Sequence, residues 1–71
     1  KIKVFSSDFL KEDLSRFDVI ILYGIGRMMP IIEEKIIKDA RDKEIRVVSN
    51  TFGFPSKEPV KTAGKIHLYK F

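Results

Sequence analysis

The chain has 71 residues, of which 14 are Lys or Arg and 10 are Asp or Glu, and its formal net charge is +4 at pH 7. It has no cysteine and one histidine, His67, which excludes a disulfide framework and any metal site built on Cys or His, so we expect no bound metal. No apolar run reaches the ~18 residues that span a bilayer, and positive and negative charges are mixed along the chain. We therefore expect a single unit, residues 1–71, that is located in the cytoplasm and away from membranes.

Residues 2–5 have the composition of a strand, and the turn-forming residues Ser6 to Asp8 follow them. Residues 9–16 are predicted to form at most two helical turns, with Leu10 and Leu14 on one face. Asp8 has two interpretations that stay open: it caps this short helix, or it points into a ligand crevice at the end of the strand.

The rest of the chain is organised around residues 17–26, where four consecutive aliphatic residues lie between Asp18 and Tyr23 and glycines follow. Such a run is typical of a strand that is covered on both faces, as in a parallel sheet. Ligands of doubly wound folds bind beyond the carboxyl ends of these strands, so Tyr23 to Gly26 is the first candidate site.

Gly24-Ile25-Gly26 stands where a dinucleotide fingerprint would stand, between a strand and a helix. The third glycine of that fingerprint is replaced by Met29, and Ser49 and Asn50 occupy the place of its acidic residue. The sequence therefore favours a plain turn over a primary NAD site.

The main helix is predicted to begin at Met28 to Pro30, because proline suits the first turn, and to continue to about Lys43. Its apolar stripe combines the following residues: Met29, Ile32, Ile36 and Ala40, widened by Ile37. Residues 45–50 are predicted to form a second buried strand, parallel to the first across a strand–helix–strand crossover.

Residues 51–59 are predicted to form a loop that exposes Phe52 and Phe54, and residues 65–71 a terminal, antiparallel strand near an edge. The fold class is α/β: a partial Rossmann-like, doubly wound sheet of about four strands with one main helix. His67 is assigned a structural role, and the aromatic residues are too poorly interleaved with Lys and Arg to indicate a nucleic-acid partner.

These residues resemble the carboxyl-terminal half of a class I S-adenosylmethionine-dependent methyltransferase. In particular, the chain is similar to the protein-lysine methyltransferase family that includes the ATP synthase c-subunit lysine methyltransferase and archaeal relatives. The matching stretches run in family order over nearly the whole chain: Ser7-Asp8-Phe9-Leu10, Asp13-Leu14-Ser15, Phe17-Asp18-Val19, Met28-Met29-Pro30, Glu33-Glu34-Lys35, residues 46–52 and Phe54-Pro55.

The resemblance implies S-adenosyl-L-methionine as cofactor and a protein lysine as acceptor, with RNA or a small molecule as alternatives. It places Asp8 and Phe9 on the adenine side of the cofactor, and Tyr23 and Gly24 beside the transferred methyl group. The substrate side would comprise these residues: Ile25, Asn50, Phe52, Phe54 and Pro55. No side chain is identified as a catalytic base.

The glycine-rich turn and the ribose carboxylate of such enzymes would precede Lys1, so we expect the 71 residues alone to be inactive. We also expect the central strand to expose an unpaired edge, which would cause self-association or pairing with a missing amino-terminal half. The alternative from another class is a non-catalytic α/β interaction module that binds a partner through an open sheet edge.

Overall fold

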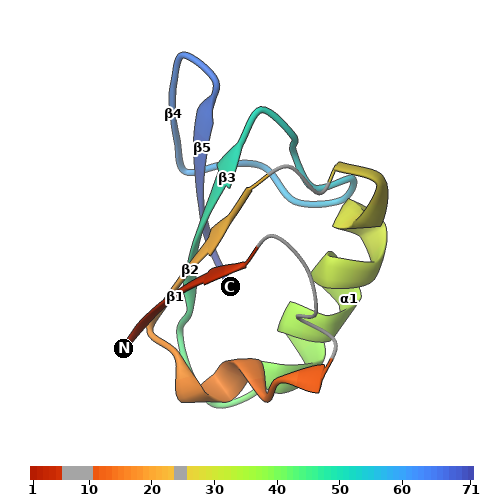
Figure 1. Ribbon diagram of the computed structural model, residues 1–71, viewed down its shortest axis with the longest axis vertical. Helices are drawn as coiled ribbons and strands as arrows, with labels where there is room; N and C mark the ends of the chain where they lie inside the picture. The colour runs from red at the N-terminus through yellow and green to blue at the C-terminus, as the bar shows by residue number, and fades with distance from the viewer. Residues whose placement is uncertain (6–10, 24–25) are drawn as a thin grey trace.

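The computed structural model describes residues 1–5, 11–23 and 26–71 (Figure 1). In chain order, its elements are β1 (Ile2–Phe5), the 3-10 helix η2 (Leu14–Arg16), β2 (Val19–Leu22), the 3-10 helix η3 (Gly26–Met28), α1 (Met29–Asp39), β3 (Arg46–Asn50), β4 (Lys61–Ala63) and β5 (Ile66–Lys70). The chain is thus a small mixed α/β domain.

The five strands form one mixed sheet in the order β1-β2-β3-β5-β4. β1, β2 and β3 are parallel, β5 is antiparallel to β3, and β4 is antiparallel to β5. The predicted parallel pair around α1 and the antiparallel last strand are confirmed. The strand count is five rather than about four, and a doubly wound arrangement is not established.

The additional strand is β4, which forms a hairpin with β5 through a two-residue turn at Gly64 and Lys65. Gly64 has a φ of +60°, the left-handed conformation that glycine adopts at little cost. As a result β5 lies between β3 and β4, one strand in from the edge of the sheet.

β2 is an interior strand, because β1 pairs with one of its edges and β3 with the other. The expectation that this central strand exposes an unpaired edge is therefore wrong. The outer strands of the described sheet are β1 and β4, and both are short, with four and three residues.

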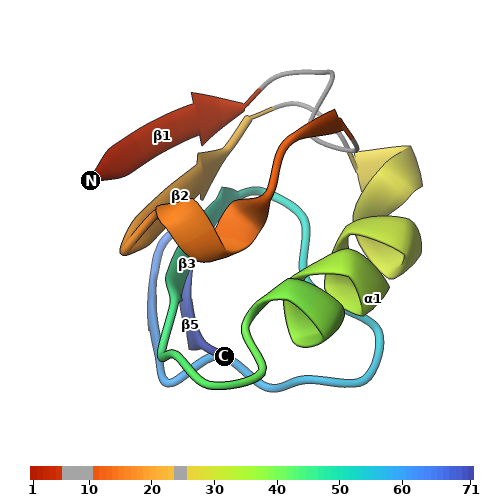
Figure 2. The same cartoon turned by 90° about the horizontal axis from the view of Figure 1, so that it is seen from below.

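The core lies between one face of the sheet and the helical segments, which Figure 2 shows on the same side of the strands. In β2, Ile20 and Leu22 are buried in this core, whereas Val19 and Ile21 alternate to the opposite face and are only half-buried. The predicted burial of this strand on both faces is therefore wrong: among the described residues, no helix covers the second face.

α1 begins at Met29 with Pro30 in its first turn, as predicted, and it buries Met29, Ile32 and Ile36. Ile37 does not widen this apolar stripe, because it is exposed and Glu33 is buried instead.

The helix ends at Asp39, about one turn before the predicted end. A turn follows, in which the Lys43 amine donates to the Ser15 carbonyl over 2.8 Å and lies 3.2 Å from the Asp18 carboxylate. These contacts draw the segment after Asp39 toward η2 and the start of β2, where a continued helix would not reach.

None of the helices in residues 1–5, 11–23 and 26–71 has the length and apolar character needed to cross a membrane.

Candidate functional site

The candidate site lies at the carboxyl ends of β2 and β3. Leu22 pairs with Ser49 in the parallel register, so Tyr23 and Asn50 occupy the next positions of the two strands. The Tyr23 amide donates to the Phe5 carbonyl over 3.0 Å, which fixes its backbone, while 59% of the residue is exposed. Tyr23 and Asn50, predicted from the sequence as cofactor-side and substrate-side residues, are thus neighbours at one edge of the sheet.

Phe52 joins this edge by packing on Gly26. A Cβ on Gly26 would lie less than 3.0 Å from three carbons of the Phe52 ring, so only glycine leaves room for the ring in this position. Phe52 is still 44% exposed and presents apolar surface to solvent. The segments that follow β2 and β3 are therefore in direct contact.

Two residues just before Phe52 hold it in place. The Ser49 hydroxyl is buried and donates a short hydrogen bond to the Phe52 carbonyl. Thr51 has a φ of 78°, a left-handed conformation that is rare for a β-branched residue, and its amide donates to the Lys65 carbonyl over 2.6 Å. The backbone thus leaves β3 in a strained turn that directs Phe52 toward Gly26.

Phe54 was predicted to be an exposed residue on the substrate side, and this is wrong, because it is only 6% exposed. Its ring packs edge-on against Tyr69 and Phe71, with centroid distances of 4.7 and 5.1 Å. Its amide donates to the Tyr69 hydroxyl over 3.1 Å. Phe54 anchors the loop to the core and is not available to a substrate.

Pro55 is exposed at the rim of a hollow of about 450 Å³ that the loop forms with Tyr69. This loop is fastened to α1 by Glu33, whose buried carboxylate accepts from the Ser56 amide over 3.2 Å and from the Ser56 hydroxyl over 2.6 Å. The contact explains why a charged residue occupies the buried side of α1.

The remaining predicted site residues, Asp8, Phe9, Gly24 and Ile25, lie outside the described residues. Of the others, the structure brings Tyr23, Asn50 and Phe52 to one edge of the sheet. Sequence reasoning included Gly26 in the candidate segment that follows β2, and Ser49 among the small polar residues that end β3, but it did not predict their contacts with Phe52. Glu33 was given no site role.

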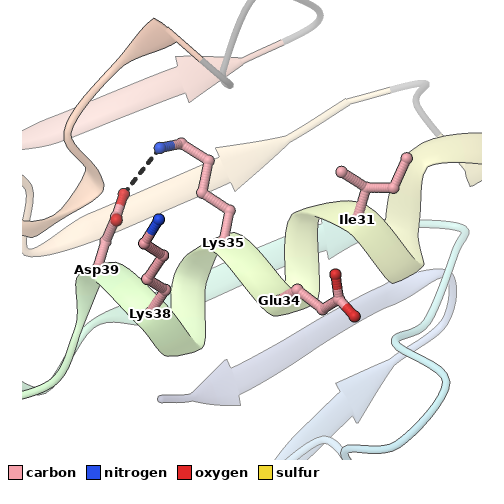
Figure 3. A pocket seen from close by; sticks show the side chains of 5 residues that line it. All are labelled: Ile31, Glu34, Lys35, Lys38 and Asp39. Atoms are coloured by element: carbon pink, nitrogen blue, oxygen red, sulfur yellow. Dashed lines mark hydrogen bonds and ion pairs between the residues drawn. The ribbon is translucent and has the colours of Figure 1, made fainter.

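A second hollow, of about 330 Å³, lies along α1 and is lined by these residues: Ile31, Glu34, Lys35, Lys38 and Asp39 (Figure 3). Lys35 points toward Asp39, and their charged groups are 2.9 Å apart. Asp39 also accepts from the Leu14 amide over 3.0 Å. Because Asp39 joins α1 to η2 and is neutralised by Lys35, this arrangement is structural.

Within residues 1–5, 11–23 and 26–71, the two carboxylates whose pKa is shifted lie away from the candidate edge. The pKa of Asp13 is lowered by hydrogen bonds from the Ser15 hydroxyl and amide, which cap η2. The pKa of Asp18 is lowered by hydrogen bonds from the terminal amine of Lys1 and from Lys43. Asp18 precedes β2 at the opposite end of the strand from Tyr23, so neither carboxylate can act at the edge.

His67 pairs with Ser49 in the ladder, and its Nδ1 lies 3.2 Å from the Thr62 hydroxyl of the neighbouring strand. This contact agrees with the structural role expected for the residue.

Comparisons with models of protein families, with curated proteins and with solved structures found no match.

Proposed function

We propose that the chain is a portion of an S-adenosyl-L-methionine-dependent methyltransferase that acts on a protein lysine in the cytoplasm. The observation that carries this proposal is the meeting of the segments after β2 and β3 at the carboxyl edge of an interior parallel strand. Parallel α/β sheets bind their ligands at this edge. The order of the sequence stretches that resemble methyltransferases, described above, indicates methyl transfer as the reaction.

The residues at this edge suit the reacting end of such a complex. The Phe52 ring offers an apolar wall, and Tyr23 and Asn50 add a hydroxyl and an amide beside it. A lysine amine must lose its proton before it can accept a methyl group, and desolvation by an apolar wall lowers the pKa of an amine. These side chains would thus orient the amine, exclude water and favour its neutral form.

The same residues do not suit the ribose end. A ribose diol is commonly held by a carboxylate, yet residues 51–55, which follow β3, contain neither Asp nor Glu. S-adenosylmethionine would supply an already activated methyl group, but the described residues provide only part of a site for it. The isolated chain is therefore expected to bind it weakly and to catalyse no transfer.

The test is a titration of the isotopically labelled chain with S-adenosylmethionine, followed by amide chemical shifts. The proposal predicts weak binding, with shifts at Tyr23, Asn50 and Phe52 and none at Arg46, at the opposite end of β3. The variant Phe52→Ala should reduce the shifts at Tyr23, whereas Val60→Ala, at another exposed apolar residue before β4, should not.

One result would count against the proposal, and a second would count against the expectation that the site is incomplete. If no amide at the carboxyl edge of β2 and β3 responds at millimolar cofactor, the edge is not a cofactor site. If the chain binds with micromolar affinity, the site is not incomplete, and the expectation of an inactive chain fails instead.

An interaction module remains the second candidate, and a specific observation favours it: one face of the sheet is apolar and uncovered in the described residues. Such a face is typical of a surface that another element covers.

A further inference from the structure

The face of the sheet opposite α1, called the back face below, carries a continuous apolar row. The ladder places Val4 beside Ile21, Ile21 beside Val48 and Val48 beside Leu68, so one apolar side chain from each of four adjacent strands lies in line. Ile2 and Val4, at the β1 end, are 68% and 59% exposed. Apolar residues that adjoin in this way form a patch, unlike the scattered exposed residues of an ordinary surface.

Positive charges border this row on the side of β3, β4 and β5. Arg46 pairs with Lys70 in the ladder, and Lys61 pairs with Leu68 at the end of the apolar row. All three residues are exposed. No strand position on the back face is occupied by Asp or Glu; the carboxylate of Glu44, 3.7 Å from Arg46, precedes β3.

The dimensions of the row fit one helix. Adjacent strands lie ~4.8 Å apart, so the four strands of the row span about 14 Å. An α-helix with its side chains is about 10–12 Å across. A single amphipathic helix laid on the back face would therefore cover most of the apolar row and bring its polar flank to the bordering cations.

We propose that the back face docks an amphipathic helix of another polypeptide, with an apolar stripe on the row and carboxylates facing Arg46, Lys61 and Lys70. A second copy of the chain is a poorer occupant, because it would bring a second set of the same cations to the interface.

The experiment uses two synthetic peptides of about eighteen residues, long enough to form a helix. Both carry the same leucine stripe, which is flanked by Glu in one and by Lys in the other. Calorimetry with the 71-residue chain should show that the acidic peptide binds at least about tenfold more tightly, with a preference that shrinks as salt is added.

Charge-reversal variants locate the binding site. Arg46→Glu and Lys70→Glu should each weaken the binding of the acidic peptide about tenfold and strengthen the binding of the basic peptide. Arg41→Glu makes the same charge change at an exposed position after α1. It should change the affinity for both peptides slightly and by the same amount. All of these positions are exposed, and circular dichroism verifies that the variants fold.

Three outcomes would overturn the proposal. The first is equal binding of the two peptides, and the second is an effect of Arg41→Glu as large as that of Arg46→Glu. The third is evidence for another occupant of the back face. Either sedimentation shows a dimer of the chain that Leu68→Lys dissociates, or the chain binds phosphatidylserine vesicles more tightly than it binds the acidic peptide. Amide shifts at Val48 and Leu68 on addition of the acidic peptide, with none at Ile36 in the core, would support it.

Discussion

The ring of Phe52 lies over Gly26, in the space that a Cβ on residue 26 would occupy. This contact joins the segment after β2 to the segment after β3, and the candidate site depends on it. Gly26 has no left-handed φ, so its role is to leave space rather than to permit an unusual backbone.

Gly26→Ala should therefore displace the Phe52 ring while changing the free energy of unfolding by less than about 1 kcal/mol, because the ring is exposed and can move outward. The Phe52 ring proton shifts should change in NMR spectra, together with the Tyr23 amide. Gly64→Ala is the matched control: at φ +60° it should cost about 1 kcal/mol and leave the Phe52 shifts as they are. Unchanged Phe52 shifts in Gly26→Ala would refute the packing.

Thr51 supplies a second prediction, because its left-handed φ of 78° strains a β-branched residue. Asn tolerates this conformation better, so Thr51→Asn should stabilise the fold by about 0.5–1 kcal/mol in urea unfolding. Thr51→Val keeps the branch and the strain and should give no gain. Should both variants destabilise equally, the side-chain contact of Thr51 with Asn50, at 3.1 Å, outweighs the strain.

The cap of η2 gives a prediction about pH. The Ser15 hydroxyl, followed by the Ser15 amide, holds the pKa of Asp13 below the ordinary value of 3.8. Ser15→Ala should raise the Asp13 pKa toward 3.8, as followed by carboxyl carbon shifts during an acid titration. Ser56→Ala, a distant serine, should leave the pKa unchanged.

The stability effect of this cap has a definite sign. Because the Asp13 pKa is lowered on folding, the cap stabilises the native state above pH 3.8, and this contribution is lost as the pH falls through the folded pKa. The difference in stability between the wild type and Ser15→Ala should therefore be present at neutral pH and shrink in acid. A difference that grows in acid would show that the assignment is wrong.

The sequence was sufficient to predict elements whose signal is local. The aliphatic run before Tyr23 identified a parallel strand, and Pro30 with its apolar stripe identified α1. Whether one face of a strand is buried depends on which elements pack against that face of the sheet, and the periodicity of the sequence does not encode this. Val19 and Ile21 were thus predicted to be buried, although no described helix covers their face of the sheet and they are only half-buried. β4 was missed because its three exposed residues carry no apolar pattern.

The candidate site was predicted only in part for the same reason. Tyr23 and Asn50 follow from the rule that parallel strands end at one edge of the sheet. The outward position of Phe52 and the inward position of Phe54 are set by the turn at Thr51 and by Tyr69, residues of separate segments. No pattern within residues 51–59 distinguishes the two phenylalanines.

The attachment of this loop to α1 is tested at Glu33. Ser56→Ala removes the donor of the 2.6 Å bond to the buried carboxylate and should cost about 1–2 kcal/mol, since hydrogen bonds to charged groups are stronger than neutral ones. A double-mutant cycle with Glu33→Gln should give a coupling energy of about 1 kcal/mol. Glu34→Gln, exposed on the next position of the helix, should change stability by less than about 0.5 kcal/mol. Zero coupling between Glu33 and Ser56 would mean that the loop is held by Phe54 alone.

Tyr69 tests that second attachment. Its hydroxyl accepts from the Phe54 amide, and both residues are buried, so Tyr69→Phe leaves an amide without a partner in the core. The expected cost is about 1–3 kcal/mol, the penalty for an unsatisfied buried donor, although the aromatic packing at 4.7 Å is kept. Hydrogen exchange at the Phe54 amide should accelerate more than exchange at the Val47 amide within β3. Tyr23→Phe removes an exposed hydroxyl and should be neutral within about 0.5 kcal/mol. If Tyr69→Phe is equally neutral and Phe54 exchange is unchanged, ring packing rather than the hydrogen bond holds the loop.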